Sequence, residues 1–519
     1  MSDLLRMTGM YSGIDTESIV SQLVEAKSQK VTTLKNEQTK LQWKQEAWQE
    51  LNTKIYSLYS KTLSDLRFTS AYQKKSTISS DTTKATVVAS GSAVNGTQTL
   101  KVKQLAKSGY LTGKELAKRE VEETKADGTT TTKKIDWATS DKLSVMDSNL
   151  VGKKITISVG TGEDKKETEI EITQDMTISD FTGKLKEAGV NASFDTTNQR
   201  FFISSAGTGE DKEFSISSEN LDSGNSVLSA LGIDENEAGC TRIKAQDAII
   251  ELNGAEFKSD TNAFTVNGLT INAVGVTEEE ISIVTSTDYD GIYNTIKDFI
   301  TEYNEIINEV NKKYNADSAR KYDVLSDEEK ESMTDEQIEK WENTIKDSLL
   351  RKDNTLYSIM DALKGAMSGG IEVNGETKYL FDYGIETLSY FEAEEDERNA
   401  YHILGDKEDD KTADKDDKLK AAIASNPEEV AEFFASLCKK MYSNLDEMMG
   451  STDYSSMYKV YEDKRLKEEY DDYTKKIKEA EEKLNEYEDK WYNKFSAMEV
   501  ALSKLQSNQN TVASMLGSS

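Results

Sequence analysis

The apolar positions near the end of the chain repeat with a helical period. From about Tyr473 to Leu516 they follow one another in steps of four and three residues, which is the spacing of a coiled-coil seam. The seam residues are Tyr473, Ile477, Ala480, Leu484, Tyr487, Trp491, Phe495, Met498, Leu502 and Leu505. Two consecutive steps of four, at Tyr487, Trp491 and Phe495, locally unwind a left-handed supercoil. The pattern predicts a long helix that needs a partner.

A second seam lies near the start of the chain, where an apolar residue recurs every seven positions, at Leu34, Leu41, Trp48 and Ile55. We expect the two terminal helices to pair through these seams. Polar amides occupy its alternate positions, at Gln38, Gln45 and Asn52, where such groups fix register and strand number at a cost in stability. The same spacing is also typical of two amphipathic helices folded on a globular body, which stays an open alternative. The residues expected to make the seam contacts with an oligomer or filament are Leu34, Leu41, Trp48, Ile55, Leu484, Trp491, Phe495 and Leu502.

The N-terminal helix has a clear start signal. Asp15 can cap the free amides of the first turn, and Glu17 is favourable near the positive end of the helix dipole. No Gly or Pro occurs between Gly13 and Gly91, so we expect the helix to run, with one interruption, to about Leu66.

After Tyr72 the composition changes to Ser, Thr and Val, which predicts strands such as 85–89 and 99–105. Asn-Gly pairs suit the positive φ angles of tight hairpin turns. They occur at Asn95-Gly96, Asn253-Gly254, Asn267-Gly268 and Asn374-Gly375. A second β region is expected between about residues 108 and 239, with one short helix at 178–188, inserted into the first.

The helical period returns in the C-terminal half. One face of the next helix carries Ile292, Ile296, Phe299, Tyr303, Ile306 and Val310. Ser326 with Glu329 and Thr334 with Gln337 are typical of capping boxes and predict two short helices. A further helix ends at Gly369-Gly370, and Asn426-Pro427 begins another.

These patterns predict an α+β multidomain fold, with a terminal helical coiled coil, a helical-bundle body and two nested antiparallel β domains inserted. The expected domains are a leg (1–42 plus 479–519), a body (43–72 plus 288–478), a β domain (73–107 plus 240–287) and an inserted outer β domain (108–239).

Charge and hydropathy narrow the class of protein. A net charge of −31 argues against nucleic acid as a partner, because phosphate backbones are bound by basic patches. No apolar run is long enough for a signal-peptide core or a membrane span. We therefore expect no membrane insertion and, if the protein is exported, a route without a cleaved signal.

The chain offers little catalytic chemistry. His402 is the single histidine, so histidine-dependent triads and multi-histidine metal sites are excluded. We expect Cys240 and Cys438 to form no disulfide. The repeated Gly-Thr-Gly-Glu-Asp-Lys at 160–165 and 207–212 is interpreted as two solvated turns rather than a phosphate cradle.

The acidic stretch 392–418 approaches the spacing of a calcium loop, but Lys411 stands where the sharp turn requires Gly, so we interpret it as a solvated loop. Calcium binding there stays open. We expect no catalytic residue, cofactor or metal, and no enzyme activity.

The order of several short motifs resembles one known family, the flagellar filament-cap proteins, or hook-associated protein 2 family. The resemblance covers nearly the whole chain. The N-terminal motifs are Gly13-Ile14-Asp15-Thr16 with Ile19-Val20 and Leu23, Gly96 to Leu100 with Gln104-Leu105-Ala106, and Ala245 to Ala248. The C-terminal motifs are Leu349 to Leu356, Leu419 to Phe434 with Ser425-Asn426-Pro427, and Met515-Leu516-Gly517. The acidic segments 315–347 and 392–418 are longer than the family core needs.

The resemblance implies an extracellular ring-shaped homo-oligomer at the distal tip of the bacterial flagellum that helps exported flagellin fold and insert. It further implies three partners besides itself: flagellin, the distal hook–filament junction protein, and the flagellar export apparatus with its chaperone. Two alternatives from other classes stay open. One is a host-surface adhesin that uses the β domains for cell adhesion, and the other is a filament or junction subunit of the flagellar axial family.

Overall fold

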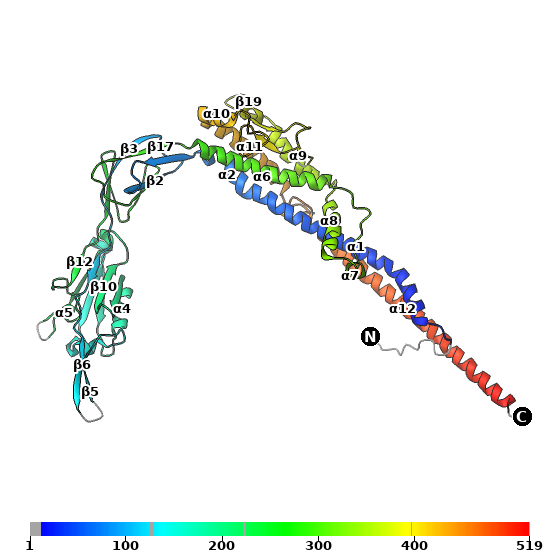
Figure 1. The fold of residues 1–519 in the computed structure, drawn as a ribbon, viewed down its shortest axis with the longest axis horizontal. Helices are drawn as coiled ribbons and strands as arrows, with labels where there is room; N and C mark the ends of the chain where they lie inside the picture. The colour runs from blue at the N-terminus through cyan, green and yellow to red at the C-terminus, as the bar shows by residue number, and fades with distance from the viewer. Residues whose placement is uncertain (1–11, 125–128, 222–224, 396, 518–519) are drawn as a thin grey trace. The chain divides into compact units, whose positions relative to one another are not determined.

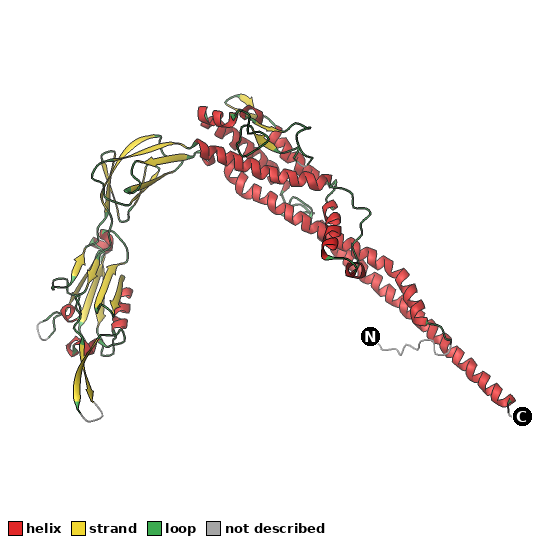
Figure 2. Cartoon of the chain, viewed as in Figure 1, coloured by secondary structure: helices red, strands yellow, loops and turns green. Residues whose placement is uncertain are grey.

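The chain forms two units, and the first is assembled from both ends of the sequence. The helical unit comprises Met1–Tyr72 and Tyr289–Ser519, and the β unit comprises Gln73–Asp288. The computed structural model describes residues 12–124, 129–221, 225–395 and 397–517, and Figures 1 and 2 trace their elements. Separate helical and antiparallel β regions confirm the predicted α+β multidomain fold.

The first long helix, α1 (Thr16–Ser57), begins where its capping signal predicts. The Asp15 side chain accepts a hydrogen bond from the Ser18 amide at 3.0 Å. The helix continues through a π-helical segment η1 (Leu58–Leu63) into α2 (Ser64–Leu66). This π-helical segment is the expected interruption. A short 3₁₀ turn, η2 (Thr69–Tyr72), ends the N-terminal part of the helical unit.

After the β unit the chain returns to the helical unit. Its helices are α6 (Tyr289–Asn315), α7 (Asp327–Glu331), α8 (Asp335–Ser348), α9 (Asn354–Ser368), α10 (Lys418–Ser425), α11 (Pro427–Met448) and α12 (Asp463–Leu516). Between α9 and α10 lie two small hairpins, β18 (Ile371–Val373) with β19 (Glu376–Lys378) and β20 (Ile385–Thr387) with β21 (Tyr401–Ile403), separated by the 3₁₀ turn η6 (Leu380–Tyr383).

Local capping chemistry sets several of these boundaries as predicted. Both expected capping boxes, at Ser326 and Thr334, are present. α12 begins at Asp463, earlier than the predicted Tyr473, because the intervening residues are mostly charged and hide the helical period.

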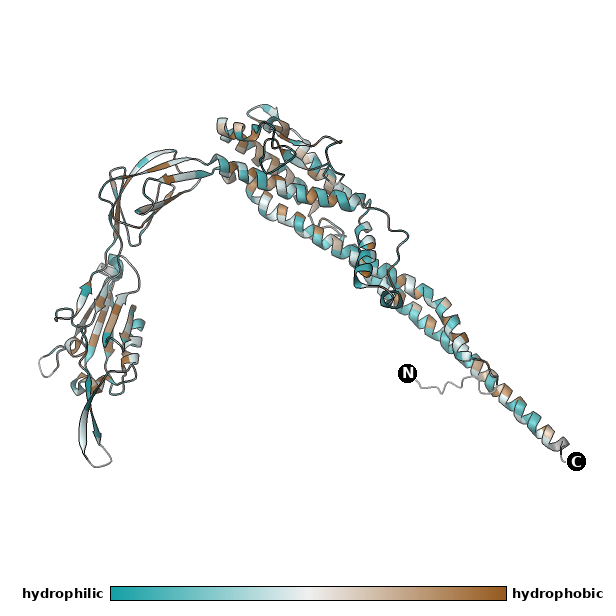
Figure 3. Ribbon diagram, viewed as in Figure 1, coloured by the Kyte–Doolittle hydropathy of each residue, from teal (hydrophilic) through white to brown (hydrophobic). Residues whose placement is uncertain are grey.

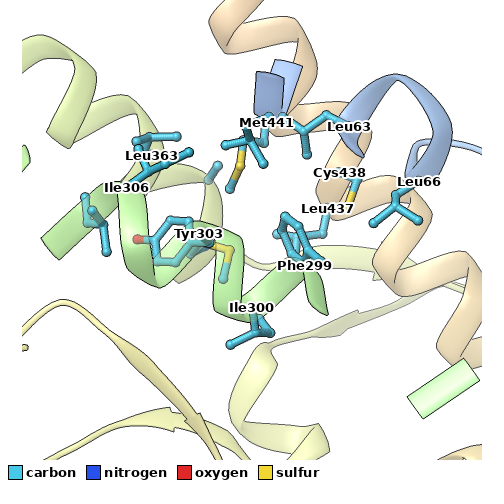
Figure 4. Packing of buried hydrophobic residues seen from close by; sticks show 14 of the residues in the cluster. Leu63, Leu66, Phe299, Ile300, Tyr303, Ile306, Leu363, Leu437, Cys438 and Met441 are labelled. Carbon is cyan, nitrogen blue, oxygen red and sulfur yellow. The ribbon is translucent and has the colours of Figure 1, made fainter. Parts of the chain in front are cut away.

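The helices share one hydrophobic core. The predicted apolar face of α6 is buried throughout, from Ile292 to Val310. Figure 4 shows Phe299 and Tyr303 of this face together with Leu437 and Cys438 of α11 and with Leu63. Burying a large apolar side chain of this kind contributes about 1.5–3 kcal/mol.

The inner part of the β unit consists of two sheets on one core. The five-stranded sheet has the order β1 (Lys75–Ser79), β17 (Ile281–Thr287), β3 (Gly96–Gln104), β13 (Ala248–Leu252) and β14 (Ala255–Ser259). The three-stranded sheet has the order β15 (Ala263–Val266), β16 (Leu269–Ala273) and β2 (Ala85–Ala89). Alternating residues face the core, such as Leu269, Ile271 and Ala273 on β16.

Three of the four Asn-Gly pairs form the predicted hairpin turns. In the turn between β15 and β16, Asn267 and Gly268 have φ angles of 49° and 79°. The prediction for Asn95-Gly96 is wrong. The strands on either side of it, β2 and β3, belong to different sheets, so the chain crosses between layers there instead of reversing.

The outer part of the β unit has its own core. One sheet has the order β12 (Thr241–Ile243), β4 (Tyr110–Thr112), β10 (Arg200–Ser205) and β9 (Val190–Asp195), and another the order β11 (Phe214–Ser218), β7 (Lys154–Val159) and β8 (Lys166–Glu171). The remaining elements are the hairpin β5 (Arg119–Thr124) and β6 (Thr130–Ile135), the helices α3 (Leu143–Met146), α4 (Ile178–Glu187) and α5 (Val227–Ala230), and the 3₁₀ turns η3 (Ser148–Leu150), η4 (Gly162–Asp164) and η5 (Glu210–Lys212). In the core, the ring of Phe181 on α4 meets Phe201 edge-on at 5.8 Å.

The helical core reaches from Leu41 on α1 to Leu466 on α12, with Tyr470 and Tyr473 packed against it. The four-part domain division, with a leg separated from the body at residues 42 and 478, stays a prediction. Residues 1–11 and 518–519 of that leg lie outside the described part of the chain.

The two cysteines are free, which confirms the expectation that they form no disulfide. Cys438 is fully buried in the helical core, and Cys240 belongs to the β unit. Within the described ranges, the helices are either too short or too polar to span a bilayer.

The buried hydroxyl of Tyr303 generates a stability prediction. This hydroxyl has no hydrogen-bond partner among the described residues, whereas the buried Tyr72 hydroxyl donates to the Leu66 carbonyl at 3.0 Å. We expect Tyr303→Phe to leave the free energy of unfolding unchanged or raise it by up to about 1 kcal/mol, because it removes an unsatisfied polar group. The matched Tyr72→Phe should lower it by about 1 kcal/mol. Denaturant unfolding followed by circular dichroism compares the two, and a clear loss in Tyr303→Phe would contradict the prediction.

Candidate assembly interface

The two terminal helices, α1 and α12, lie side by side and run antiparallel (Figure 1). The contact partners show the direction, because a higher residue number on α1 meets a lower number on α12. Lys35 pairs with Glu481 at 2.7 Å, and the Gln38 amide donates to Thr474 Oγ1 at 2.7 Å. Further along, Trp48 meets Tyr461, which lies just before the start of α12. The predicted pairing of the chain ends is therefore confirmed.

Toward the body, the seam is fully buried. The rings of Trp48 and Tyr461 stack at 5.4 Å with only 6° between their planes. Trp48 is 2% exposed, and Leu51 and Ile55 are fully buried below it. This end of the helix pair belongs to the core of the helical unit.

The predicted contact residues differ in how deeply they are buried. Of the predicted contact residues, Leu41, Trp48 and Ile55 are buried, whereas Leu34, Leu484, Trp491, Phe495 and Leu502 are only half-buried. Toward the end of α12, Leu505 is 66% exposed. Figure 3 shows hydrophobic positions recurring among hydrophilic ones along both helices. The role of these residues in assembly stays a prediction.

The step of four and four in the seam forms an aromatic ladder. Trp491 lies 6.2 Å from the Tyr487 ring and 6.0 Å from the Phe495 ring. The indole N–H of Trp491 has no hydrogen-bond partner among the described residues. Indole N–H groups at interfaces normally find an acceptor. The aromatic ladder therefore contains a hydrogen-bond donor that no acceptor among the described residues satisfies.

The polar seam residues Asn52 and Gln38 make different kinds of hydrogen bond. Asn52 is buried and bonds to backbone, donating to the Tyr458 carbonyl at 3.2 Å and accepting from the Val460 amide at 2.9 Å. It thereby fixes the loop that leads into α12. Gln38 instead reaches across to α12.

Other seam residues escaped the sequence analysis. Val20 and Val31 are buried and Val24 is half-buried on α1. Extending the heptad upstream from Leu34 would have found all three, since steps of three and four lead from Leu34 to Val31, Lys27, Val24 and Val20. Tyr461 could not be found in this way, because it precedes the helix.

The acidic stretch 392–418 and His402, considered above for metal binding and catalysis, make ion pairs and hydrogen bonds within the chain. In the acidic stretch 392–418, Asp406 and Glu408 both bind the Lys297 ammonium, at 2.8 and 2.6 Å. His402 Nδ1 lies 2.7 Å from Asp409. Burial raises the pKa of Asp409, but hydrogen bonds from His402 and neighbouring donors outweigh it and hold the pKa below its usual range. Within the described residues, no group of three or more His, Cys, Asp or Glu side chains is placed to hold a metal ion.

The buried thiol of Cys438 also suits packing rather than chemistry. It lies 3.7 Å from the Tyr72 hydroxyl, and burial raises its pKa to about 12. A thiol with that pKa carries almost no thiolate near neutral pH, and the thiolate is the reactive form.

Comparison with known proteins finds matches to flagellar hook-associated protein 2. Two family profiles match: one described as flagellar hook-associated protein 2 N-terminus, over residues 12–109, and one described as its C-terminus, over residues 245–507. The flagellar hook-associated protein 2 of Halalkalibacterium halodurans is 25% identical over 446 residues, which cover 82% of this chain and 78% of the relative. That of Thermotoga maritima is 28% identical over 365 residues, which cover 67% of this chain and 53% of the relative.

A solved structure supports the fold. The crystal structure of the D1-D2-D3 domains of the flagellar cap protein FliD from Escherichia coli superimposes with a TM-score of 0.50 at 19% sequence identity. The match covers 78% of this chain and 97% of that one. At this identity the likeness concerns the fold alone.

The difference in burial between Trp48 and Leu505 predicts a difference in their effects on stability. We expect Trp48→Ala to lower the free energy of unfolding by about 3–5 kcal/mol, because it opens a cavity beside Tyr461 in a closed core. Leu505→Ala, at an exposed position of the same seam, should change it by less than about 0.5 kcal/mol. Denaturant titration of both variants measures the difference, and equal losses would show that the seam is one uniform core.

Proposed function

The chain belongs to the flagellar hook-associated protein 2 family, and on that premise we propose that it forms an oligomeric cap at the distal end of the bacterial flagellar filament. In this role it promotes the folding and insertion of exported flagellin. Its partners are other copies of itself in a ring, flagellin, the distal hook–filament junction protein, and the export apparatus with its chaperone. It acts outside the cell and is exported without a cleaved signal peptide.

The observation that carries this proposal is the incomplete burial of the terminal seam. Two helices in water bury one stripe each, and a long helix gains most of its stability from such burial. Here Leu484, Trp491, Phe495 and Leu502 remain half-buried, and Leu505 is exposed. Apolar surface of this kind is suited to docking on other helices at the end of a filament.

The β unit supports a role in which its two parts act as separate folded modules. Its inner and outer parts have distinct hydrophobic cores, one around Ile250 and Ile271 and the other around Phe181 and Phe201. Modules with their own cores stay folded while the terminal helices exchange partners.

Adhesion is a second candidate function, favoured by one surface of the outer β part. On the four-stranded sheet, Tyr110 pairs with Ile243, and Thr112, two residues further along the same face, pairs with Phe202. Tyr110, Ile243 and Phe202 are 49%, 47% and 37% exposed. Aromatic side chains next to Ser and Thr hydroxyls can stack on sugar rings and bond to their hydroxyl groups.

A filament or junction subunit, the remaining alternative, also pairs its terminal helices. It differs in that copies add to an open end. Purified protein that grows into open filaments would support this alternative against the cap.

Removal of residues 479–519 tests the cap proposal. The helical core uses α12 only up to Leu466, with Tyr470 and Tyr473 against it, so the truncated chain should keep a cooperative melt close to that of the full protein. Cells that carry it should secrete flagellin into the medium and build no filaments, because the cap loses its anchoring surface. Circular dichroism, immunoblots of the medium and electron microscopy measure the three outcomes.

The control for this experiment is the truncated protein itself, which must appear in the medium, since its absence would indicate failed export rather than failed anchoring. Normal filaments on these cells would contradict the proposal.

A glycan array of the full chain tests adhesion. If the sheet face binds sugars, the double variant Tyr110→Ala with Phe202→Ala should lose the signal by at least about tenfold, which corresponds to about 1.4 kcal/mol. Val88→Ala is the matched control, because Val88 is an exposed apolar residue of the inner β part. A wild-type protein that binds no glycan would remove this candidate.

A further inference from the structure

Two grooves run along the line where α1 and α12 meet. The first, the lysine groove, has a volume of about 490 Å³. Its lining includes Lys27, Lys30, Lys476 and Lys483, and Glu479 is the one acidic residue among the described residues that line it. The second, the acidic groove, has a volume of about 400 Å³, and its lining includes Glu17, Glu25 and Glu488, with no Lys or Arg among its described residues. The same helix pair therefore carries grooves of opposite charge.

Some of these charged side chains have an ion-pair partner among the described residues, and others have none. Lys476 pairs with Asp472 at 2.9 Å, and Lys483 lies 3.9 Å from Glu479. Lys27 and Lys30 are exposed, and no carboxylate among the described residues lies within ion-pair distance of either. Lys27 stands at a seam position of the heptad, with its ammonium 5.7 Å above the Tyr487 ring.

Glu17 and Glu25 in the acidic groove are likewise exposed and have no ion-pair partner among the described residues. The lysine groove gathers four lysines although the protein has a net charge of −31.

The two grooves occupy opposite flanks of the helix pair. An α-helix turns by about 100° per residue. Relative to the seam residue Val31, Lys27 and Lys30 lie about 40° and 100° to one side, whereas Ser21 and Ser28, which line the acidic groove, lie about 80° and 60° to the other.

The same division holds on α12. Relative to Leu484, Lys476 and Lys483 lie about 80° and 100° to one side, and Glu488 and Tyr492 lie about 40° and 80° to the other. A single helix pair cannot bring these two flanks together.

We propose that the lysine groove of one copy binds the acidic groove of a second copy of this chain. This inference rests on the proposed function, since it assigns the contact between neighbouring subunits of the cap. The lysines on the rim of one groove reach the glutamates on the rim of the next. Leu34 and Leu484 on one side and Val24 and Tyr492 on the other, all half-buried, supply apolar contact between them.

The charge arrangement dictates the symmetry of this contact. Because the grooves lie on opposite flanks, a two-fold contact can use only one of them, and it then places like against like, which is repulsive. Pairing of unlike grooves is head-to-tail, and a head-to-tail contact repeats from copy to copy and forms a ring where the rotation closes. The grooves are centred about eight residues apart along α1, or about 12 Å, so neighbouring helix pairs are staggered and each tilts across the ring axis.

Charge reversal in the full-length protein tests the pairing. Lys27→Glu with Lys30→Glu, and separately Glu17→Lys with Glu25→Lys, should each weaken self-association by at least about tenfold at low salt, because like charges then face each other. A chain that carries all four substitutions should associate like the wild type. It should also fail to assemble together with the wild type, because their grooves would then repel. Light scattering and electron microscopy of particles measure association and ring closure.

Two controls accompany the reversals. Lys475→Glu with Lys478→Glu makes the same charge change at exposed positions of α12 that line neither groove, and should leave association unchanged. Because Glu17 lies in the first turn of α1, circular dichroism checks the helix content of each variant. Glu25→Lys alone, outside that turn, should weaken association in the same direction.

The outcomes separate this inference from the proposed function. Rings of wild type that persist in both double variants would overturn the groove pairing and leave the cap proposal standing. Wild-type protein that stays monomeric at every concentration would overturn both. If Lys27→Glu with Lys30→Glu forms normal rings but cells that carry it build no filaments, the lysine groove binds a filament subunit, and the pairing between copies is wrong.

Discussion

The burial of one helical seam determines how the rest of the structure is organised. Fixing the backbone of a residue costs about 1–2 kcal/mol, so a helix as long as α12 needs apolar burial along its length to be stable. Where the helical body surrounds the pair, this need is met completely, as at Trp48 and Tyr461. Farther along, each helix has only the other, and residues such as Leu484 and Phe495 stay half-buried. The pair is therefore firmly held at one end and open to further partners at the other.

Pairing the two ends of the chain imposes a topology on everything between them. Every later domain must be an insertion that leaves and returns at the same place. The structure meets this condition by pairing the strands that enter and leave each insertion. β1 pairs with β17 where the β unit begins and ends, and β4 pairs with β12 where the outer part does. Each inserted part then builds its own core, and the two family profiles, which end at residue 109 and resume at residue 245, leave out the outer part.

The charged side chains also differ between the helical core and the terminal helix pair. In the helical unit, the Lys297 ammonium is paired within the chain, with Asp406 and Glu408. On the helix pair, four lysines line one groove and three glutamates line the other, on the opposite flank. Surface ion pairs contribute little to the stability of a single chain, but opposite fields on two flanks orient neighbours and exclude wrong arrangements.

The sequence by itself determined the features that depend on neighbours a few residues away. The heptad spacing of Leu41, Trp48 and Ile55, the capping boxes at Ser326 and Thr334 and the hairpin turn at Asn267-Gly268 all follow from local hydrogen bonding and backbone angles. The resemblance to the cap family came from the order of such local motifs. Tertiary structure decided the rest. The stack of Tyr461 on Trp48, the backbone partners of Asn52 and the crossing at Asn95-Gly96 join residues far apart in the chain or in different sheets. A helical period records which face is apolar, but the group that covers that face is chosen only when the whole core packs, because burial depends on every element that surrounds it.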